Sequence, residues 1–275
     1  MDVNEYARRK QTILNRMIAG LVYVFRQFLT PFLTRRSWFD FMRVMYRVIK
    51  QYRDEATELA REFYDDNRAE QLPDEPRHDI FKDDHYPEEW LRETMEPVYQ
   101  NLQKTGNIEG AVQDTTNRAV KVVEDSARRT ILRGLDTDTS QPIRGFARFD
   151  PRPPTCAFCT MMISRGPVYA HDTAGFSGSK ESAASLWRDN DTDAMNELMN
   201  RWHPGCTCIA VPVYKLSGYP TERQEEEALK IYIAARKRAQ RKGDVSFKAI
   251  LKEMRKDLYN PSTEEDETTL TRSVA

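Results

Sequence analysis

The chain has 275 residues, of which 39% are hydrophobic and 31% are charged, and its formal net charge is −1. This low apolar and high charged content favours helices with extended solvated surfaces over one thick globular core, and the length allows one large domain or two ordinary ones. A net charge close to zero excludes a global electrostatic bias of the molecule toward nucleic acid or a membrane surface.

Apolar side chains recur at three- and four-residue steps between Ile13 and Leu29, which predicts a helix that Pro31 ends. The most apolar stretch, 17–33, is interrupted by polar and charged residues and is too short to span a bilayer. The basic residues near the start are followed by amphipathic rather than continuously apolar sequence, so we expect no secretory signal. We therefore expect a buried helix face and no stable membrane insertion.

A long second helix is predicted between Ser37, which has capping-box spacing to Asp40, and the residues before Pro73. The charge changes sign along this region, because residues 1–53 carry eleven basic and three acidic side chains and residues 54–96 carry five basic and sixteen acidic ones. Such blocks indicate docking to charged partners or packing of one block against the next, although each block alone is also typical of a solvated helix face.

The segment 73–87 is interpreted as an exposed linker, because it combines three prolines with many acidic residues. A third helix is predicted over 88–105, with a kink at Pro97, and a fourth from Ile108 to a closing Gly134. Helices of this length with one apolar face each must bury those faces on one another or on another protein.

The pattern changes in the second half of the chain, where two short aromatic or β-branched runs, 145–150 and 208–214, predict strands. Thr221 and Gln224 predict the capped start of a charged helix that ends at Gly243, and a shorter amphipathic helix follows. The sequence thus predicts an α+β fold with helices over 1–135, a small module over 143–220, C-terminal helices over 221–260 and a disordered tail over 261–275.

All four cysteines occur in two close pairs, Cys156 and Cys159 in CAFC and Cys206 and Cys208 in HPGCTC, and His203 precedes the second pair. Zinc prefers thiolate sulfur and imidazole nitrogen in a tetrahedron, and a Cys-x-x-Cys turn brings two sulfurs to one ion while backbone amides stabilise their charge. In a regular strand, Cys206 and Cys208 would point to opposite faces. We therefore expect the ligands to be Cys156, Cys159, His203 and Cys206, with Cys208 buried in the strand. The close alternative is a site of all four cysteines that excludes His203.

The cysteines have three other possible uses: disulfides, a Cys–His catalytic pair, and unliganded core positions. Disulfides are disfavoured because the thiols of a cytosolic protein are reduced. For a catalytic pair, no orienting acid or amide is evident. A structural Zn²⁺ is favoured, because the short strands bury little apolar surface and bound zinc contributes on the order of 10 kcal/mol to the folding of a small domain. Four protein ligands leave no open position for water or substrate, so we expect no metal catalysis.

The motifs CAFC and HPGCTC, with a short strand before the first and IAVPVY after the second, resemble the C-terminal domain of the Mu protein F-like minor capsid proteins of tailed bacteriophages. This resemblance covers about 145–214. The helical region, with FMRVMYRVIKQYRDEATELAREFYDD at 41–66, is similar in texture to head-morphogenesis proteins of phages of actinobacteria. Gly205 and Thr207 depart from the family pattern, which usually has asparagine and a basic residue there.

The resemblance implies a virion component in few copies, at the capsid interior or the portal vertex, which is present in the host cytoplasm during assembly. It implies the phage portal protein and the major capsid protein as partners, a role in head assembly or after DNA ejection, and no established chemistry. We therefore expect a structural minor capsid protein and no enzyme.

An enzymatic alternative rests on GFSGS at 175–179, which nearly matches the Gly-x-Ser-x-Gly motif. Some phage proteins of this neighbourhood are labelled capsid maturation proteases. A protease or another head-associated enzyme of the phage, which uses Ser177 with His171 or a cysteine, is therefore the second function considered. However, no apolar strand leads into the motif, and a Gly/Ser loop explains the same residues. The basic stretch 230–242 beside a zinc module indicates non-specific contact with packaged DNA at most.

Overall fold

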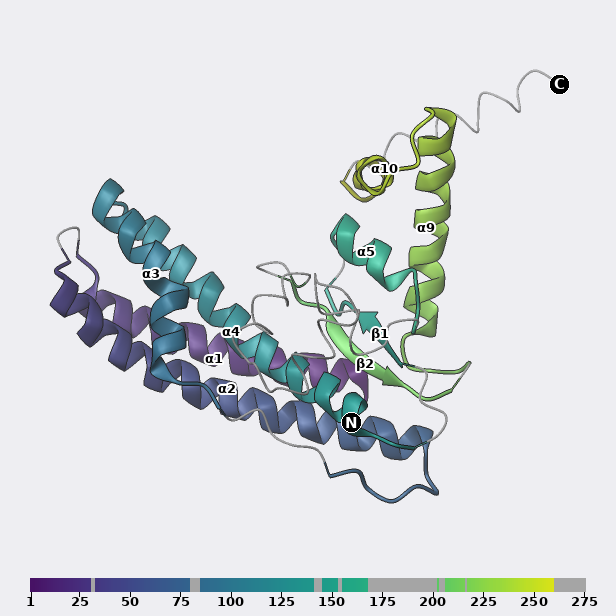
Figure 1. The fold of residues 1–275 in the computed structure, drawn as a ribbon, viewed down its shortest axis with the longest axis horizontal. Coiled ribbons are helices and arrows are strands. Elements are labelled where there is room, and N and C mark those ends of the chain that lie inside the picture. Colours follow the sequence, from purple (N-terminus) through teal and green to yellow (C-terminus); the bar gives the residue numbers. More distant parts are fainter. Residues whose placement is uncertain are drawn as a thin grey trace.

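The computed structural model describes residues 1–30, 33–79, 85–140, 145–152, 155–167, 202, 206–215 and 217–259. It has an α+β fold, as predicted, in which long helices precede a two-stranded antiparallel sheet and further helices. The first four helices form one elongated body, and the sheet with the remaining helices lies at one end of it (Figure 1). The predicted tail lies outside the described residues.

Four helices make up the first half of the chain: α1 (Val3–Phe28), α2 (Arg35–Gln71), α3 (Glu88–Thr105) and α4 (Ile108–Thr137). The Asp2 side chain caps α1 by accepting hydrogen bonds from the N–H groups of Asn4 and Glu5, so this helix begins well before its apolar repeat. The expected cap of α2 is wrong, because the hydroxyl of Thr34 accepts from the Ser37 N–H and Ser37 already belongs to the helix.

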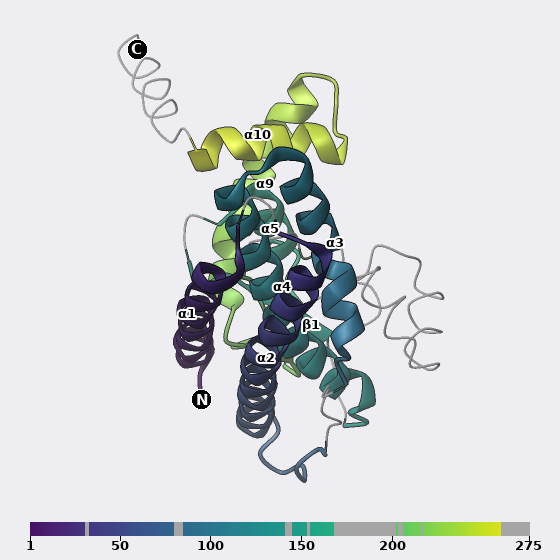
Figure 2. The ribbon, with the colours of Figure 1, turned by 90° about the vertical axis from the view of Figure 1, so that its left-hand side faces the viewer.

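The apolar faces of these helices bury one another, as their pattern predicts. Figure 2 looks along the body and shows the four helices side by side, with α2 and α4 in extensive contact. Met17, Phe41 and Ile49 are fully buried, and Tyr6 stacks on Phe63 with the ring centroids 4.4 Å apart. At roughly 1.5–3 kcal/mol for each large apolar side chain that is fully buried, this shared core is the main source of stability.

The basic and acidic blocks of the first half of the chain face each other where α1 meets α2. Arg9 pairs with Glu62 at 2.6 Å, and Arg16 pairs with Glu55 at 3.0 Å. These pairs are partly exposed, so each contributes about 0–1 kcal/mol. Packing of one block against the next therefore accounts for part of the charge pattern, and the pairs favour one alignment of the two helices.

The close approach of α2 and α4 explains Gly134, which the sequence predicts as a helix end. That prediction is wrong, since α4 continues to Thr137. A Cβ at position 134 would lie 2.7 Å from Cε2 of Tyr64, so the glycine leaves the room in which this ring packs. The Tyr64 hydroxyl donates to the Gly134 carbonyl oxygen at 3.0 Å.

Two strands form the sheet at the predicted positions: β1 (Gly145–Phe149) and β2 (Ile209–Val213). Their antiparallel register places Phe146 opposite Pro212. β2 is buried along its whole length because it packs on α2 and α4. The Gln71 side chain of α2 closes the other edge of β2, donating to the Pro212 carbonyl oxygen at 2.9 Å and accepting from the Tyr214 N–H at 3.0 Å. The sheet therefore shares the core of the helical body.

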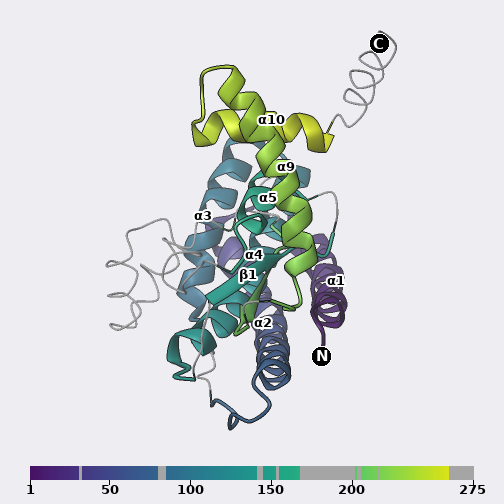
Figure 3. The same ribbon diagram turned by 90° about the vertical axis from the view of Figure 1, so that its right-hand side faces the viewer.

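Three further helices in the described part of the chain are α5 (Ala157–Ile163), α9 (Glu222–Arg241) and α10 (Phe247–Tyr259). The sequence did not predict α5. Thr221 is the N-cap residue of α9, as predicted, but it makes no side-chain cap hydrogen bond, and the Gln224 side chain instead exchanges hydrogen bonds of 2.9 and 2.8 Å with the backbone of Asp150. Figure 3 shows α9 beside the sheet and α10 across the far end of α9. None of the described helices is long and apolar enough to cross a membrane.

Candidate metal centre

Three thiol groups meet where α5 packs against the entry to β2. The sulfurs of Cys159, Cys206 and Cys208 all lie within 4.8 Å of one another, and the Sγ atoms of Cys159 and Cys206 are 3.6 Å apart. Cys159 lies in the first turn of α5, and the other two residues directly precede β2. All four cysteines of the chain are free thiols. The two sequence motifs therefore converge on one buried cluster.

The structure corrects the expected position of Cys208. Cys208 was expected to be excluded because Cys206 and Cys208 would point to opposite faces of a regular strand. β2 begins only at Ile209, so the alternation of strand side chains does not apply to the cysteines. Both sulfurs therefore reach Cys159, and the reason for excluding Cys208 does not hold.

Cys156 has the position expected of the first residue of a zinc knuckle. It is the N-cap of α5, and its sulfur accepts a hydrogen bond from the Cys159 N–H at 3.2 Å. This bond stabilises negative charge on sulfur in the way predicted for a Cys-x-x-Cys turn. Cys156 is half-buried. His203, the remaining predicted ligand, lies outside the described residues, as do Ser177 and His171.

The donor set fits a soft divalent cation. In a tetrahedral zinc site with Zn–S bonds of about 2.3 Å, neighbouring sulfurs are about 3.8 Å apart. The 3.6 Å between the sulfurs of Cys159 and Cys206 agrees with this spacing. A ring of thiolates favours zinc and other thiophilic metals over magnesium or calcium, which prefer oxygen. A fourth ligand from Cys156 or His203 would complete the tetrahedron.

Hydrogen bonds among the thiols shift their pKa values, and a bound cation would replace these hydrogen bonds. Hydrogen bonds from Cys159 and Cys208, together with the nearby charge of Arg128, lower the pKa of Cys206 well below its usual range. The pKa of Cys159 is raised, because its thiol hydrogen-bonds with Cys156, Cys206 and Cys208 and is buried. One thiolate is thus stabilised by the protons of its neighbours. A bound metal would take over that role and release those protons.

Arg128 of α4 holds the backbone of the second cysteine pair. Its Nη2 donates to the Cys206 carbonyl oxygen at 2.5 Å, and its Nε donates to the Cys208 carbonyl oxygen at 3.2 Å. The same guanidinium pairs with Asp125 at 2.9 Å and with Glu124 at 3.2 Å. Burial disfavours its charge, but these two carboxylates and the Cys206 thiolate outweigh that effect and raise the pKa of Arg128. The cysteine cluster is therefore attached to the helical body by a buried charged group.

An aromatic ring adds to this attachment. Trp202 is fully buried, and the guanidinium of Arg128 lies 4.4 Å from the centroid of its ring system. The guanidinium of Arg148, from β1, lies 3.8 Å from the same centroid. Such cation–π contacts are strongest when water is excluded, as it is here. Trp202 therefore joins α4 to β1 one residue before the HPGCTC motif.

Thr207, between the two cysteines, is fixed from two sides. Its hydroxyl donates to Asp150 Oδ1 at 2.7 Å, at the end of β1. Its carbonyl oxygen accepts from Nζ of Lys10 at 3.4 Å, and this buried lysine of α1 also pairs with Glu124 at 3.1 Å. Position 207, where the resembling family usually has a basic residue, thus makes its contacts here through a hydroxyl and a carbonyl oxygen.

The signal in the sequence for these supporting residues is weak. Glu124, Arg128, Ile131 and Leu135 share one helix face, because they follow each other at steps of three or four residues. Charged residues on an otherwise apolar face are candidates for buried pairs. The pattern does not reveal that the carbonyl groups bound by Arg128 lie 78 and 80 positions further along the chain.

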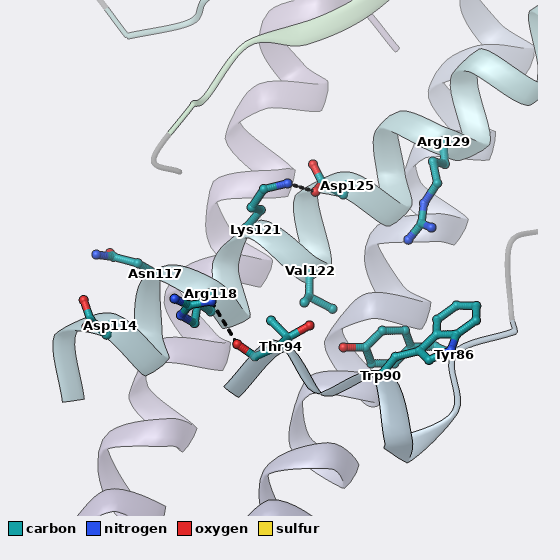
Figure 4. Close-up of a pocket in the computed structure, with 10 residues that line it drawn as sticks. All are labelled: Tyr86, Trp90, Thr94, Asp114, Asn117, Arg118, Lys121, Val122, Asp125 and Arg129. Carbon is teal, nitrogen blue, oxygen red and sulfur yellow. Dashed lines mark hydrogen bonds and ion pairs between the residues drawn. The ribbon is translucent and has the colours of Figure 1, made fainter. Parts of the chain in front are cut away.

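Away from the cysteine cluster, a cavity of about 420 Å³ lies between α3 and α4 (Figure 4). Trp90 and Thr94 of α3 face Arg118 and Lys121 of α4 across it, with Tyr86 at one end. Arg118 donates to the Thr94 carbonyl oxygen at 2.9 Å, and Lys121 pairs with an aspartate one turn further on. Because these two cations already have partners within the protein, the cysteine cluster is the stronger candidate site.

The fold and the cluster define a class: a helix-dominated α+β protein whose buried thiols form a candidate metal centre at the junction of helices and sheet. Residues 1–235 match the family model described as VG15 protein. The chain is 32% identical to the Gene 15 protein of Mycobacterium phage D29 over 231 residues. This match covers 81% of this chain and 84% of the relative. The chain is 30% identical over 255 residues to the Gene 15 protein of Mycobacterium phage L5, covering 86% and 85%.

The chain therefore belongs to the VG15 protein family, and it is a phage protein. No solved structure matches it. The predicted phage origin is confirmed at this level, whereas the resemblance to Mu protein F-like proteins stays a prediction.

Proposed function

We propose that the chain is a structural minor capsid or head-morphogenesis protein of a tailed phage, which docks on the portal or the inner capsid surface through its helices. In this proposal the cysteine cluster is a closed structural Zn²⁺ site. The observation that carries it is the attachment of that cluster to α4: Arg128 holds the carbonyl groups of both Cys206 and Cys208. A centre built into the junction of two structural units stabilises their arrangement.

Burial supports a structural rather than a catalytic metal. The side chains of Cys159, Cys206 and Cys208 are 2%, 2% and 0% exposed. With Cys156 or His203 as the fourth ligand, no coordination position is left for water or substrate. The same burial argues against a nucleophilic cysteine, which must reach its substrate. The alternative function, a capsid maturation protease that uses Ser177 and His171, rests on residues outside the described part of the chain.

Docking through helices is supported by the shape of the body and by phage origin. α2 has 37 residues and is therefore about 55 Å long at 1.5 Å per residue. A body of this length offers continuous side faces to a neighbouring subunit, and the resemblance in CAFC and HPGCTC points to the portal or major capsid protein as that neighbour. We place the protein at the capsid interior or portal vertex of the virion, and in the host cytoplasm during assembly.

The location is tested with phage particles. Immunoblots of gradient-purified heads, from a phage that carries this gene, are expected to detect the chain in few copies per particle. Co-expression with the portal protein or the major capsid protein of the same phage is expected to yield a co-purifying complex. Absence of the chain from both immature and mature heads would refute the proposal.

The metal is tested by elemental analysis of the purified chain, which is expected to hold about one zinc. Cys156→Ser should lower zinc content if the four cysteines are the ligands, and His203→Ala should then leave it unchanged. The opposite pattern would support the set with His203. Ser177→Ala serves as the matched control and should change neither zinc content nor any cleavage of head proteins. A fully folded chain without bound metal would contradict the structural site.

A further inference from the structure

The C-terminal helices carry a strongly one-sided charge. Residues 230–256 contain ten basic and two acidic side chains, although the whole chain has a net charge of −1. Nine of the ten are exposed: Lys230, Arg236, Lys237, Arg241, Lys242, Lys248, Lys252, Arg255 and Lys256. We call these nine residues the α9–α10 basic surface. Most of it follows residue 235, where the match to the family model ends, so family membership does not assign it.

The lysines of α10 form a regular row. Lys248, Lys252 and Lys256 are spaced four residues apart, so they share one face of the helix at intervals of about 6 Å. Lys242, at the end of α9, lines a shallow cleft of about 330 Å³ with these three lysines. Ammonium groups from two helices therefore surround one concave site.

The surface is held in place by a buried carboxylate beneath it. Glu253 is 4% exposed and pairs with Lys242 at 2.6 Å and with Lys256 at 3.3 Å. Arg238 of α9 lies 3.7 Å from the same carboxylate and also pairs with Asp257. The hydrogen bond from Lys242 is the main reason why the pKa of Glu253 is lowered. The two helices thus present their cations in a fixed arrangement.

Within the part of the chain that the structure describes, most of this positive charge has no acidic partner. Among the described residues, Lys242 and Lys256 pair with Glu253, and the other seven members of the surface make no ion pair: Lys230, Arg236, Lys237, Arg241, Lys248, Lys252 and Arg255. Like charges four residues apart destabilise a helix, so the row on α10 opposes the stability of the isolated chain. The first turn of α9 is acidic instead, with Glu222 and Glu225, and its last turn is basic, which leaves the cations concentrated toward the end of α9 and in α10. A solvated face of ordinary composition would mix both signs.

We propose that the α9–α10 basic surface binds the phosphate backbone of double-stranded DNA without sequence preference. Evenly spaced ammonium and guanidinium groups match a partner with uniform, dense negative charge, and Lys and Arg are the side chains that contact DNA phosphates. The biological setting, packaged DNA inside the head, rests on the proposed function. Binding itself depends only on the surface, so the two can fail separately.

The test is fluorescence anisotropy of the full chain with a labelled duplex of mixed sequence, measured between 50 and 200 mM KCl. Each neutralised phosphate contributes about −0.9 to the slope of log K against log salt, so about five contacts give a slope near −4.5 and a loss of affinity of several hundred-fold over this range. Lys248→Gln, Lys252→Gln and Arg255→Gln together should reduce the magnitude of the slope by about 2.7 and weaken binding at least tenfold at 50 mM salt.

The matched control removes three exposed cations from the helical body, with Arg36→Gln, Arg47→Gln and Lys104→Gln, and should leave the slope within about 0.5 of the parent value. Circular dichroism melts of both triple variants should show no loss of stability relative to the parent, since none of the six side chains is buried. The proposal is overturned if both variants lose affinity equally, if binding does not depend on salt, or if poly-glutamate of equal charge binds as tightly as DNA. Equal affinity for poly-glutamate would assign the surface to an acidic protein instead.

Discussion

Replacing Arg128 by methionine tests whether the cysteine centre and the helical body form one structure. Methionine keeps much of the side-chain length and apolar contact but removes every donor of the guanidinium. The carbonyl oxygens of Cys206 and Cys208 then lose the hydrogen bonds of 2.5 and 3.2 Å that hold them to α4. Glu124 and Asp125 lose a buried cationic partner.

The expected loss is about 4 kcal/mol of unfolding free energy. Removing one partner of a buried ion pair costs about 3–5 kcal/mol, and each buried carbonyl group left without a donor adds up to about 1–3 kcal/mol. These terms do not add in full, because Lys10 still pairs with Glu124 and Lys121 still pairs with Asp125. A domain has about 5–15 kcal/mol of stability in total, so Arg128→Met should shift unfolding clearly.

Urea unfolding followed by circular dichroism measures this change. Arg36→Met, an exposed arginine of α2, is the control and should shift the unfolding free energy by less than about 0.5 kcal/mol. Adding Asp125→Asn to Arg128→Met should recover part of the loss, since this carboxylate loses its buried partner, whereas Glu124 keeps the buried Lys10 as a partner. A loss below about 1 kcal/mol for Arg128→Met would refute the view that this side chain joins the two units.

Gly134→Ala is expected to destabilise the chain by about 1–3 kcal/mol in thermal unfolding, because its Cβ meets a tyrosine ring of α2. Gly20→Ala, whose Cβ would have ordinary contacts, should be neutral or stabilising by up to about 1 kcal/mol; equal effects would contradict this packing. Burial opposes ionisation of Asp138, but hydrogen bonds from an arginine of α2 and from Ser140 lower the pKa of this carboxyl. The contribution of Asp138 to stability is therefore present above about pH 4 and is lost as the pH falls. In acid titrations of stability Asp138→Asn should flatten this decline, and an unchanged profile would exclude the assignment. Chelation should release zinc and lower the melting temperature of the parent chain; an unchanged melt after complete release would argue against a stabilising metal.

The main helices could be predicted because their signals are local. The repeat of apolar residues every three or four positions marked the long helices, and Pro31 and Pro73 bounded the first two. Helix ends were less predictable where a nearby packing contact competes with local geometry. Gly134 lies inside α4 because a ring packs on it, and Gln224 bonds the end of β1 instead of capping α9.

The cysteine site was predictable as a set of residues but not as a geometry. The spacing of the two pairs was enough to expect that they meet, because such pairs have few other uses in one chain. The position of Cys208 depended on the residue at which β2 begins, and that boundary is set by pairing with β1 and by packing on α2 and α4. A shift of one or two residues in a strand boundary decides which side chains face the site.

The sequence by itself determined the helical periodicity, the two short strands and the four thiols that can meet, since each of these depends on residues that are near neighbours in the chain. The tertiary structure decided which thiols meet and what holds them there. Arg128 and the carbonyl groups that it binds are 78 and 80 positions apart, and a buried cation is tolerated only where the fold brings acceptors to it. No local pattern encodes such a partner, because its energy depends on burial that exists only after the helices and the sheet have packed together.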